Sequence, residues 1–145
     1  MLFRQCAGGI VFYYDKVFLL KNEKNEWVFP KGVIRNGAYA HDVAIKRVKE
    51  ETGLDATIIA PVGETSYEFY SLTRHEPVCN QITWFLMEAQ SDKYQVPKEQ
   101  GFTGGGFFNI IEALSRVTYS QDKSLLNIAY RKWKEIEREN CVVNK

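Results

Sequence analysis

The chain has 145 residues, of which 45% are hydrophobic and 26% charged, and its formal net charge is +1. This composition excludes a disordered protein, and the length fits a single domain, residues 1–145, that buries roughly two thirds of its unfolded surface. A net charge so close to zero gives no overall field to attract a nucleic-acid polymer or an acidic membrane, so an anionic ligand must be bound by local charge.

The cysteine content and the lengths of the apolar runs indicate the cellular compartment of the protein. Cys6, Cys79 and Cys141 are odd in number and form no CxxC pair, and only two histidines accompany them, so we expect no zinc site. Free thiols are typical of a reducing cytosol. We see no basic leader with an apolar core, and no apolar run approaches the ~20 residues that span a bilayer. The sequence predicts a soluble, cytoplasmic monomer or homodimer without a membrane partner.

The N-terminal third is predicted to form strands. Residues 6–14 and 17–20 are rich in β-formers and are separated by Asp15 and Lys16, which predicts two strands joined by a tight turn. A short third strand over 27–29 should end at Pro30, because proline cannot continue a ladder. We expect the residues from Lys31 to Gly37 to form a polar loop.

A helix is predicted from about Tyr39 to Thr52, because apolar residues recur there at spacings of three and four. Gly53 follows as a typical C-terminal stop. The spacing places one set of residues on the inward face: His41, Ala44, Ile45, Val48 and Thr52.

The second half of the chain is predicted to contain strands first and helices last. Strands are expected over 54–62, 64–72 and 81–89, and a polar, glycine-rich loop over 91–106. Asn109 and Glu112 are typical of a helix cap with a returning glutamate, and Ser120 should begin the last helix. The apolar stripe of that helix is Leu125, Leu126, Ala129, Trp133 and Ile136. This order predicts an α/β fold with a mixed sheet flanked by helices.

Three charged residues on the 39–52 helix could carry chemistry. By helical angle Glu51 borders the apolar face, Arg47 comes next and Glu50 lies beyond it, so the three cluster on one surface. A cluster of carboxylates there would hold one or two magnesium ions and let substrate phosphates complete the shell. Arg47 is instead a permanent cation, and its simplest role is an ion pair with Glu50 or Glu51. A solvated face with intrahelical salt bridges is the alternative.

The segment from Pro30 to Leu54 resembles the Nudix box, which begins with a glycine and ends in a Glu-Glu pair, a spacer, a glycine and an apolar residue. The positions in register are Gly32, Val48, Glu50, Glu51, Gly53 and Leu54. The resemblance extends to the Ala7-Gly8-Gly9 opening and to the late Phe107-Phe108 pair, and so covers nearly the whole chain. It implies a Nudix α/β/α sandwich with the mixed sheet between the box helix and the C-terminal helix. The layout resembles that of diadenosine and nucleoside polyphosphate hydrolases.

The box departs from the family pattern at three charged positions. Ala38 stands in place of the first glutamate, and Lys46 and Arg47 stand in place of an Arg-Glu pair. The resemblance gives that glutamate a role as metal ligand and, in some members, as base. Glu to Arg changes the local charge by two units, and a unit charge about 5 Å away interacts by roughly 3 kcal/mol at a dielectric of about 20. We therefore expect two-metal catalysis to be severely weakened.

Other residues could take part in the site. The resemblance makes Glu51, Glu50 and Glu99 the candidate catalytic residues, although Glu99 could equally be an exposed loop carboxylate. Glu64 and Glu68 could also act as a base, and strand alternation leaves open which of them faces the cleft. Lys31, Gly32 and Arg47 are expected to bind phosphate, with Arg35 and Lys46 nearby. Candidates for stacking on a nucleobase, or for the core, are Trp27, Tyr67, Phe69, Tyr70 and Trp84.

The sequence leaves three functions open. The first is a binding module for a nucleoside diphosphate-linked or dinucleoside polyphosphate ligand, in which Arg47 replaces the metal's charge and hydrolysis is weak or lost. The second is an active pyrophosphohydrolase that holds magnesium on Glu50 and Glu51 and recruits a glutamate from outside the box. The third, ranked last, is a domain that binds a protein partner. In the first two the ligand is a small nucleotide.

Overall fold

The computed structural model describes residues 1–143, and side chains as far as Asn140. At its centre lies a mixed sheet of order β3-β2-β1-β6-β5, in which β4 also pairs with β1 and β7 with β2. Strands β1 and β6 run parallel, whereas the other pairs are antiparallel. The strands are β1 (Leu2–Tyr13), β2 (Lys16–Asn22), β3 (Trp27–Val28), β4 (Lys31–Val33), β5 (Ala56–Ser71), β6 (Glu76–Ala89) and β7 (Phe102–Asn109).

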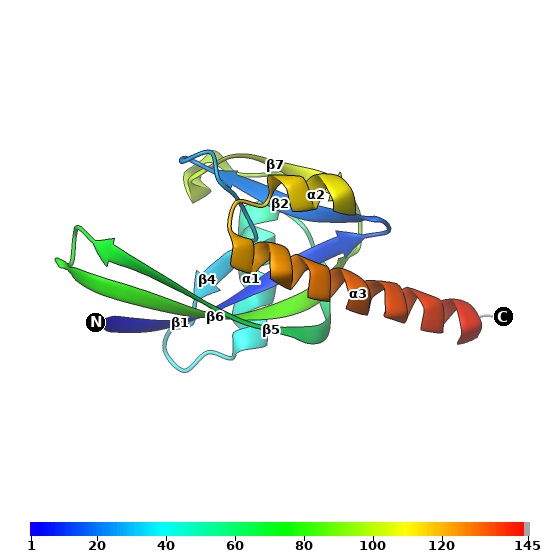
Figure 1. The fold of residues 1–145 in the computed structure, drawn as a ribbon, viewed down its shortest axis with the longest axis horizontal. Coiled ribbons are helices and arrows are strands. Elements are labelled where there is room, and N and C mark those ends of the chain that lie inside the picture. Colours follow the sequence, from blue (N-terminus) through cyan, green and yellow to red (C-terminus); the bar gives the residue numbers. More distant parts are fainter. Residues whose placement is uncertain (144–145) are drawn as a thin grey trace.

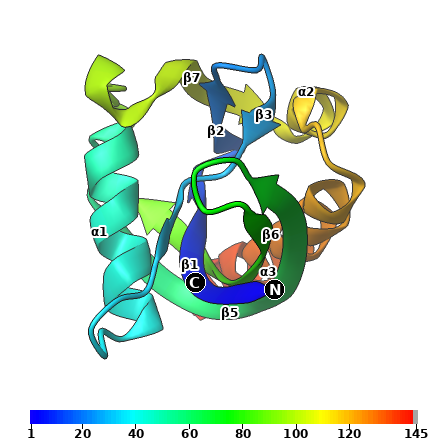
Figure 2. The same cartoon turned by 90° about the vertical axis from the view of Figure 1, so that its left-hand side faces the viewer.

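Helices cover both faces of this sheet. The helices are α1 (Ala40–Thr52), α2 (Ile110–Arg116) and α3 (Ser120–Val143), with a 3₁₀ turn η1 (Lys98–Gln100) before β7. Helix α1 lies on one side of the strands, and α2 and α3 lie on the other (Figures 1 and 2). One apolar cluster, with Val11 and Val48, fills the space under α1, and a second, with Phe12 and Leu126, fills the space under α3. The predicted α/β/α sandwich is confirmed.

The first two strands form the expected hairpin, with Tyr14 at a positive φ of 50° in the turn. The predicted loop from Lys31 is wrong at its start, because residues 31–33 form β4 and pair with Cys6 to Gly8. The predicted strand over 27–29 is β3, which ends one residue early at Val28, and the Pro30 carbonyl oxygen accepts a hydrogen bond from the Gly9 N–H at 3.1 Å. This pairing holds the chain around Lys31 and Gly32 against the centre of the sheet.

Helix α1 begins and ends where the sequence predicts. Gly53 adopts the left-handed conformation and donates its N–H to the Lys49 carbonyl at 2.9 Å, which closes the helix. The predicted inward face is only partly right, because His41 and Ile45 are exposed. The buried positions are Ala44, Val48, Glu51 and Thr52. The helix is therefore rotated so that a carboxylate, rather than a histidine, faces the sheet.

The long strands differ from the prediction in two places. The expected strands over 54–62 and 64–72 are one strand, β5, because the ladder with β6 continues past two register shifts, between Ile58 and Ala60 and between Pro61 and Gly63. The expected loop over 91–106 is wrong at its C-terminal end, where Gly104, Gly105 and Gly106 lie in β7 and pair with β2. A side chain on Gly105 would stand 3.0 Å from the Leu19 carbonyl oxygen, so glycine permits this close approach.

The C-terminal helices follow the predicted signals. The Asn109 side chain accepts a hydrogen bond from the Glu112 N–H at 2.9 Å and caps α2, and α3 starts at Ser120. The stripe of α3 is buried from Leu125 to Trp133. Cys6 and Cys79 are free and buried, whereas the side chain of Cys141 lies outside the described residues. Among the helices described here, none has the length and apolar character needed to cross a membrane.

Candidate functional site

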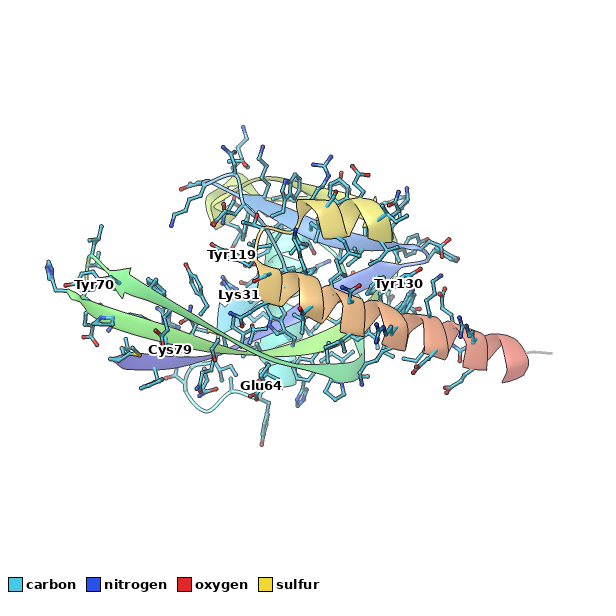
Figure 3. The ribbon with its side chains drawn as sticks, in the orientation of Figure 1. Lys31, Glu64, Tyr70, Cys79, Tyr119 and Tyr130 are labelled. Carbon is cyan, nitrogen blue, oxygen red and sulfur yellow. The ribbon has the colours of Figure 1, made fainter. Side chains whose placement is uncertain are left out.

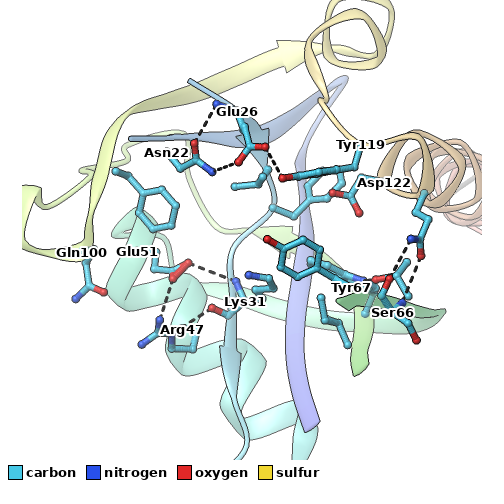
Figure 4. Close-up of a pocket in the computed structure, with 17 residues that line it drawn as sticks. Asn22, Glu26, Lys31, Arg47, Glu51, Ser66, Tyr67, Gln100, Tyr119 and Asp122 are labelled. Carbon is cyan, nitrogen blue, oxygen red and sulfur yellow. Dashed lines mark hydrogen bonds and ion pairs between the residues drawn. The ribbon is translucent and has the colours of Figure 1, made fainter. Parts of the chain in front are cut away.

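A cavity of about 250 Å³ lies between the C-terminal half of α1, the start of α3 and the sheet (Figure 4). Its apolar wall consists of Val28, Phe29, Ile82, Trp84 and Phe102. Its polar wall consists of Asn22, Glu26, Lys31, Arg47, Glu51, Thr65, Ser66, Tyr67, Gln100, Tyr119, Gln121 and Asp122. An aromatic cleft with a few converging charged groups is the usual form of a small-molecule site.

Arg47 occupies the centre of the charged end of this cavity. Its Nη2 lies 3.3 Å from Glu51 Oε2 and its Nη1 lies 3.5 Å from Glu50 Oε2. Its Nε donates a hydrogen bond to the Lys31 carbonyl oxygen at 3.3 Å. The guanidinium therefore contacts two carboxylates and a carbonyl at once. The ion pair that the sequence predicted with either glutamate is formed with both.

Gly32 makes room for the Arg47 side chain. A Cβ atom added to Gly32 would lie 2.3 Å from Arg47 Cγ and 2.6 Å from its Cδ and Nε. Gly32 is buried in β4, with the aliphatic part of Arg47 lying directly over it. The first glycine of the box thus has a physical role in this chain, which is to let Arg47 reach across β4.

Glu51 is a buried acid. Its side chain is 2% exposed, and its Oε1 accepts a hydrogen bond from the Lys31 N–H at 3.3 Å. Burial raises the pKa of Glu51 to about 7, even though the positive charges of Arg47 and Lys31 act in the opposite direction. Glu51 is therefore only partly ionised at neutral pH. The positive charge of Arg47 stabilises the ionised form of this buried carboxyl group.

The pKa of Glu51 predicts how stability depends on pH. A carboxyl whose pKa is raised from 4.5 to about 7 on folding favours the folded state below pH 4.5 and loses that contribution as pH rises through 7. Glu51→Gln should unfold like the wild type at pH 4.5 and be more stable at pH 8, by on the order of 3 kcal/mol. Denaturant unfolding of both proteins at the two pH values measures this. A difference between the two proteins that does not change with pH would contradict the burial of an ionisable group here.

A magnesium ion, which the family resemblance implies, fits these residues poorly. Magnesium needs several oxygen ligands in near-octahedral geometry, usually with at least one ionised carboxylate. Here Glu50 Oε2, Glu51 Oε2 and the Lys31 carbonyl oxygen face the Arg47 guanidinium, while Glu50 Oε1 faces Lys46 Nζ and Glu51 Oε1 accepts from the Lys31 N–H. In the part of the chain that the structure describes, no three acidic, histidine or cysteine side chains come close enough together to hold a metal. An ion at this position would stand next to a fixed positive charge.

Several predicted site residues meet in the cavity and others do not. Lys31, Arg47 and Glu51 line it, Gly32 lies under Arg47, and Glu50 contacts Arg47 from the rim. Glu99 is exposed on η1, and it is its neighbour Gln100 that lines the cavity. Arg35 is exposed in the loop before α1, and the exposed Lys46 pairs with Glu50 at 3.8 Å.

The two strand glutamates do not face the cavity. Of the β5 residues, Thr65, Ser66 and Tyr67 line the cavity. Glu64 and Glu68 lie on either side of this segment, are exposed and do not line the cavity, and Figure 3 shows Glu64 on the far side of the sheet from Lys31 and Tyr119. Neither glutamate is placed to act as a base at this site.

Of the five aromatic residues that the sequence suggested for stacking on a base, two line the cavity and three do not. Tyr67 and Trp84 line the cavity, and the Trp84 indole N–H donates to Thr65 Oγ1 at 2.8 Å, which holds the ring in place. The other three lie elsewhere, because Trp27 packs on Phe108, Phe69 lies under Arg4, and Tyr70 is exposed.

A second polar group, which sequence reasoning missed, lies across the cavity from Arg47. The Tyr119 hydroxyl donates a short hydrogen bond to Glu26, and the Asn22 side-chain amide donates another to the same carboxylate at 2.9 Å. These hydrogen bonds lower the pKa of Glu26 and raise that of Tyr119. Asp122 is nearby in the first turn of α3, and burial raises its pKa to about 6. No sequence motif identifies these residues, because they come from two segments, 22–26 and 119–122, that are far apart in the chain.

The comparison with protein families agrees with this geometry. The family model described as NUDIX domain matches residues 3–127. The chain therefore belongs to the Nudix family, and its predicted resemblance is confirmed.

Individual relatives match the chain at low sequence identity and over only part of their length. The chain is 31% identical over 105 residues to the putative mutator protein MutT4 of Mycobacterium tuberculosis, a match that covers 71% of this chain and 40% of that protein. It is 28% identical over 82 residues to an RNA pyrophosphohydrolase of Hydrogenovibrio crunogenus, a match that covers 50% of each. The chain thus spans half or less of these relatives' own length.

Solved structures share the fold at low identity. An Ap4A hydrolase of C. elegans, solved as a binary complex, superposes with a TM-score of 0.73 at 17% identity, covering 91% of this chain and 98% of that one. The dihydroneopterin triphosphate pyrophosphohydrolase of E. coli gives a TM-score of 0.68 at 16% identity, covering 87% and 95%. The fold and its layout are therefore those of Nudix hydrolases that include an Ap4A hydrolase.

Proposed function

We propose that this protein binds a nucleoside diphosphate-linked or dinucleoside polyphosphate ligand without a metal ion, and that its hydrolytic activity is weak or lost. The observation that carries the proposal is the position of Arg47, whose guanidinium contacts Glu50, Glu51 and the Lys31 carbonyl together. A fixed cation at this point supplies, through the protein itself, the positive charge that a divalent ion would bring to a diphosphate.

The cavity offers the groups that such a ligand needs. Three of the five guanidinium N–H groups of Arg47 face Glu50, Glu51 and the Lys31 carbonyl, so two remain to donate to phosphate oxygens, and Lys31 adds a second positive charge beside it. The aromatic wall around Trp84 and Phe102 provides flat surfaces for a base. A volume of about 250 Å³ is smaller than most drug-sized sites, so the second half of a dinucleotide would extend outside.

The same arrangement works against hydrolysis. Attack on phosphorus requires an activated water and charge stabilisation that develops in the transition state. Glu51 already accepts from the Lys31 N–H and pairs with Arg47, so it is poorly placed to take a proton from water. Glu64 and Glu68 are exposed and do not line the cavity, and the exposed Glu99 is the remaining candidate outside the box.

Thermal shift in the presence of EDTA tests the proposal. Diadenosine tetraphosphate, ATP and inorganic tripolyphosphate should each raise the melting temperature of the wild type, since ligands stabilise the state that binds them. Arg47→Gln should abolish the shifts, whereas Arg35→Ala, which removes an exposed arginine outside the cavity, should preserve them. Phosphate release should stay near background when magnesium is added. Rapid magnesium-dependent turnover that Glu51→Gln abolishes would show instead that the protein is an active hydrolase.

The role of Gly32 gives a further prediction. Gly32→Ala places a methyl group within 2.3 to 2.6 Å of the Arg47 side chain and must displace it. We expect tripolyphosphate affinity to fall about tenfold, equivalent to about 1.4 kcal/mol, as measured by calorimetric titration in EDTA. Gly104→Ala is the matched control, because no atom lies within 4 Å of an added Cβ there. Equal losses in both variants would show that the effect does not pass through Arg47.

A further inference from the structure

The outer edge of β5 extends beyond the sandwich, in the hairpin that β5 forms with β6. Within the described residues β5 pairs with β6 alone, and it does so in regular register from Glu64 to Ser71. Figures 1 and 3 show this hairpin reaching past the helices, with Tyr70 near its tip. An edge strand of this kind presents backbone groups with which a further strand can pair.

The contacts of Ser66 show which backbone groups face this edge. The Gln121 side-chain amide accepts from the Ser66 N–H at 3.3 Å and donates to the Ser66 carbonyl oxygen at 3.0 Å, as the peptide group of a neighbouring strand would. Because the orientation alternates along a strand, the N–H and C=O of Glu68 and Tyr70 face the same way. Pro77, which lies opposite Tyr70 in the ladder, agrees with this, since it has no N–H to exchange. No other part of residues 1–143 bonds to these groups of Glu68 and Tyr70.

This part of the edge lacks the lysines, prolines and bulges that usually protect such strands. The register shifts of β5 lie within 58–63, before the hairpin leaves the sandwich, and residues 64–71 contain no lysine, arginine or proline. Two side chains at its end are large and apolar, because Tyr70 is 57% exposed and Leu72 is 80% exposed. An unshielded edge with apolar side chains is a surface to which another chain adds as a strand.

The two faces of the segment differ in charge. Tyr67 and Phe69 lie on one face, where their rings stack 5.5 Å apart, and the Arg4 guanidinium lies 5.5 Å over the Phe69 ring. Glu68 and Tyr70 lie on the other face. Glu68 is exposed and takes part in none of the ion pairs of the described chain. One face is therefore aromatic with a positive charge, and the other is acidic.

We propose that the β5 edge beyond Gln121 binds an extended peptide with basic side chains on one face and apolar side chains on the other. The peptide backbone pairs with the N–H and C=O groups of Glu68 and Tyr70. A lysine or arginine of the peptide then lies across from Glu68 and close to the Tyr70 ring, and the apolar side chains cover the two stacked rings of the opposite face. A second copy of β5 is a poorer occupant, because it would bring acidic side chains near one another. This surface is separate from nucleotide binding and does not depend on it.

NMR titration of the isotope-labelled protein with a short, end-capped peptide of alternating lysine and valine tests the proposal. The amide signals of Glu68 and Tyr70 should shift, and their hydrogen exchange should slow by at least about tenfold at saturation, because these groups gain hydrogen bonds. The exchange of the Tyr67 and Phe69 amides, which face β6, should change little. The same peptide with N-methyl groups on its central residues should not bind, because it has lost its backbone donors.

Charge reversal tests the predicted chemistry of the peptide. Glu68→Lys should weaken binding of the lysine-valine peptide about fivefold and should favour a glutamate-valine peptide instead, because the cross-strand charges are reversed. Glu135→Lys is the matched control, since it makes the same change of charge at an exposed position on α3. It should leave the affinity for both peptides unchanged.

Three results would overturn the proposal. The first is no binding of the lysine-valine peptide at concentrations up to about 1 mM, or binding that leaves the Glu68 and Tyr70 amides unchanged. The second is equal binding of the N-methylated peptide, which would show that the backbone edge is not used. The third is protection of the same two amides that rises with protein concentration in the absence of peptide, which would show that a second copy occupies the edge. Nucleotide and metal are absent throughout, so these results are independent of the function proposed above.

Discussion

Arg47→Glu should turn the metal-free anion site into a site that responds to magnesium. The substitution removes a cation and adds a third carboxylate beside Glu50 and Glu51, so the local charge changes by two units. Each unit charge about 5 Å from a phosphate is worth roughly 3 kcal/mol at a dielectric of about 20. We expect the affinity for tripolyphosphate in EDTA to fall at least 100-fold, as measured by calorimetric titration.

The gain of magnesium binding is the second half of this prediction. Three carboxylates and the Lys31 carbonyl oxygen would form an oxygen-rich group of the kind magnesium prefers. Magnesium should therefore raise the melting temperature of Arg47→Glu and leave that of the wild type unchanged. Arg47→Gln is the matched control, because it removes the cation without adding a carboxylate, and it should lose anion binding without gaining a magnesium response. Magnesium stabilisation of the wild type equal to that of Arg47→Glu would refute the idea that Arg47 occupies the metal position.

The chemistry of α1 could be predicted because it follows from local geometry. Helical spacing alone placed Arg47 between Glu50 and Glu51, and the structure contains both ion pairs. The burial of the Glu51 side chain could not be predicted from helical spacing. His41 and Ile45 fit the helical spacing as well as the buried Ala44 and Val48 do. The rotation of α1 about its axis depends on tertiary packing against the sheet. This rotation buries the Glu51 side chain.

Glycine gave a misleading signal in β7. Three consecutive glycines normally indicate a loop, because they add backbone entropy and no side chain to pack. Here they form a strand, since β2 supplies the backbone partners and Gly105 approaches Leu19 closely. Pairing between residues some 85 positions apart is a long-range effect that local propensity does not encode.

The cavity residues opposite Arg47 could not be predicted for a related reason, which is that they come together only in the folded chain. Asn22, Glu26, Tyr119 and Asp122 fit their local roles as turn, loop and helix-start residues, and none belongs to a motif. Only the folded chain brings 22–26 next to 119–122, through hydrogen bonds such as that from Tyr119 to Glu26.

Trp133→Ala should cause the largest loss of stability in the α3 layer, which carries Asp122. The Trp133 ring is 3% exposed and stacks on Phe12 with centroids 5.4 Å apart, and its indole N–H donates to the Tyr14 carbonyl at 2.8 Å. Removing a buried aromatic of this size costs about 3–5 kcal/mol, which corresponds to a fall in melting temperature of roughly 10 °C or more.

Trp133→Phe separates packing from hydrogen bonding. It keeps a six-membered ring on Phe12 and removes the five-membered ring with its N–H, so it should cost about 2 kcal/mol, because most of the stacking stays and water can reach the Tyr14 carbonyl at the exposed turn. Hydrogen exchange of the α3 amides should accelerate strongly in Trp133→Ala and little in Trp133→Phe, since local opening follows the packing that is lost. If the two variants are equally destabilised, the hydrogen bond rather than the stacking anchors α3, and the position of Asp122 then depends on the β1–β2 turn.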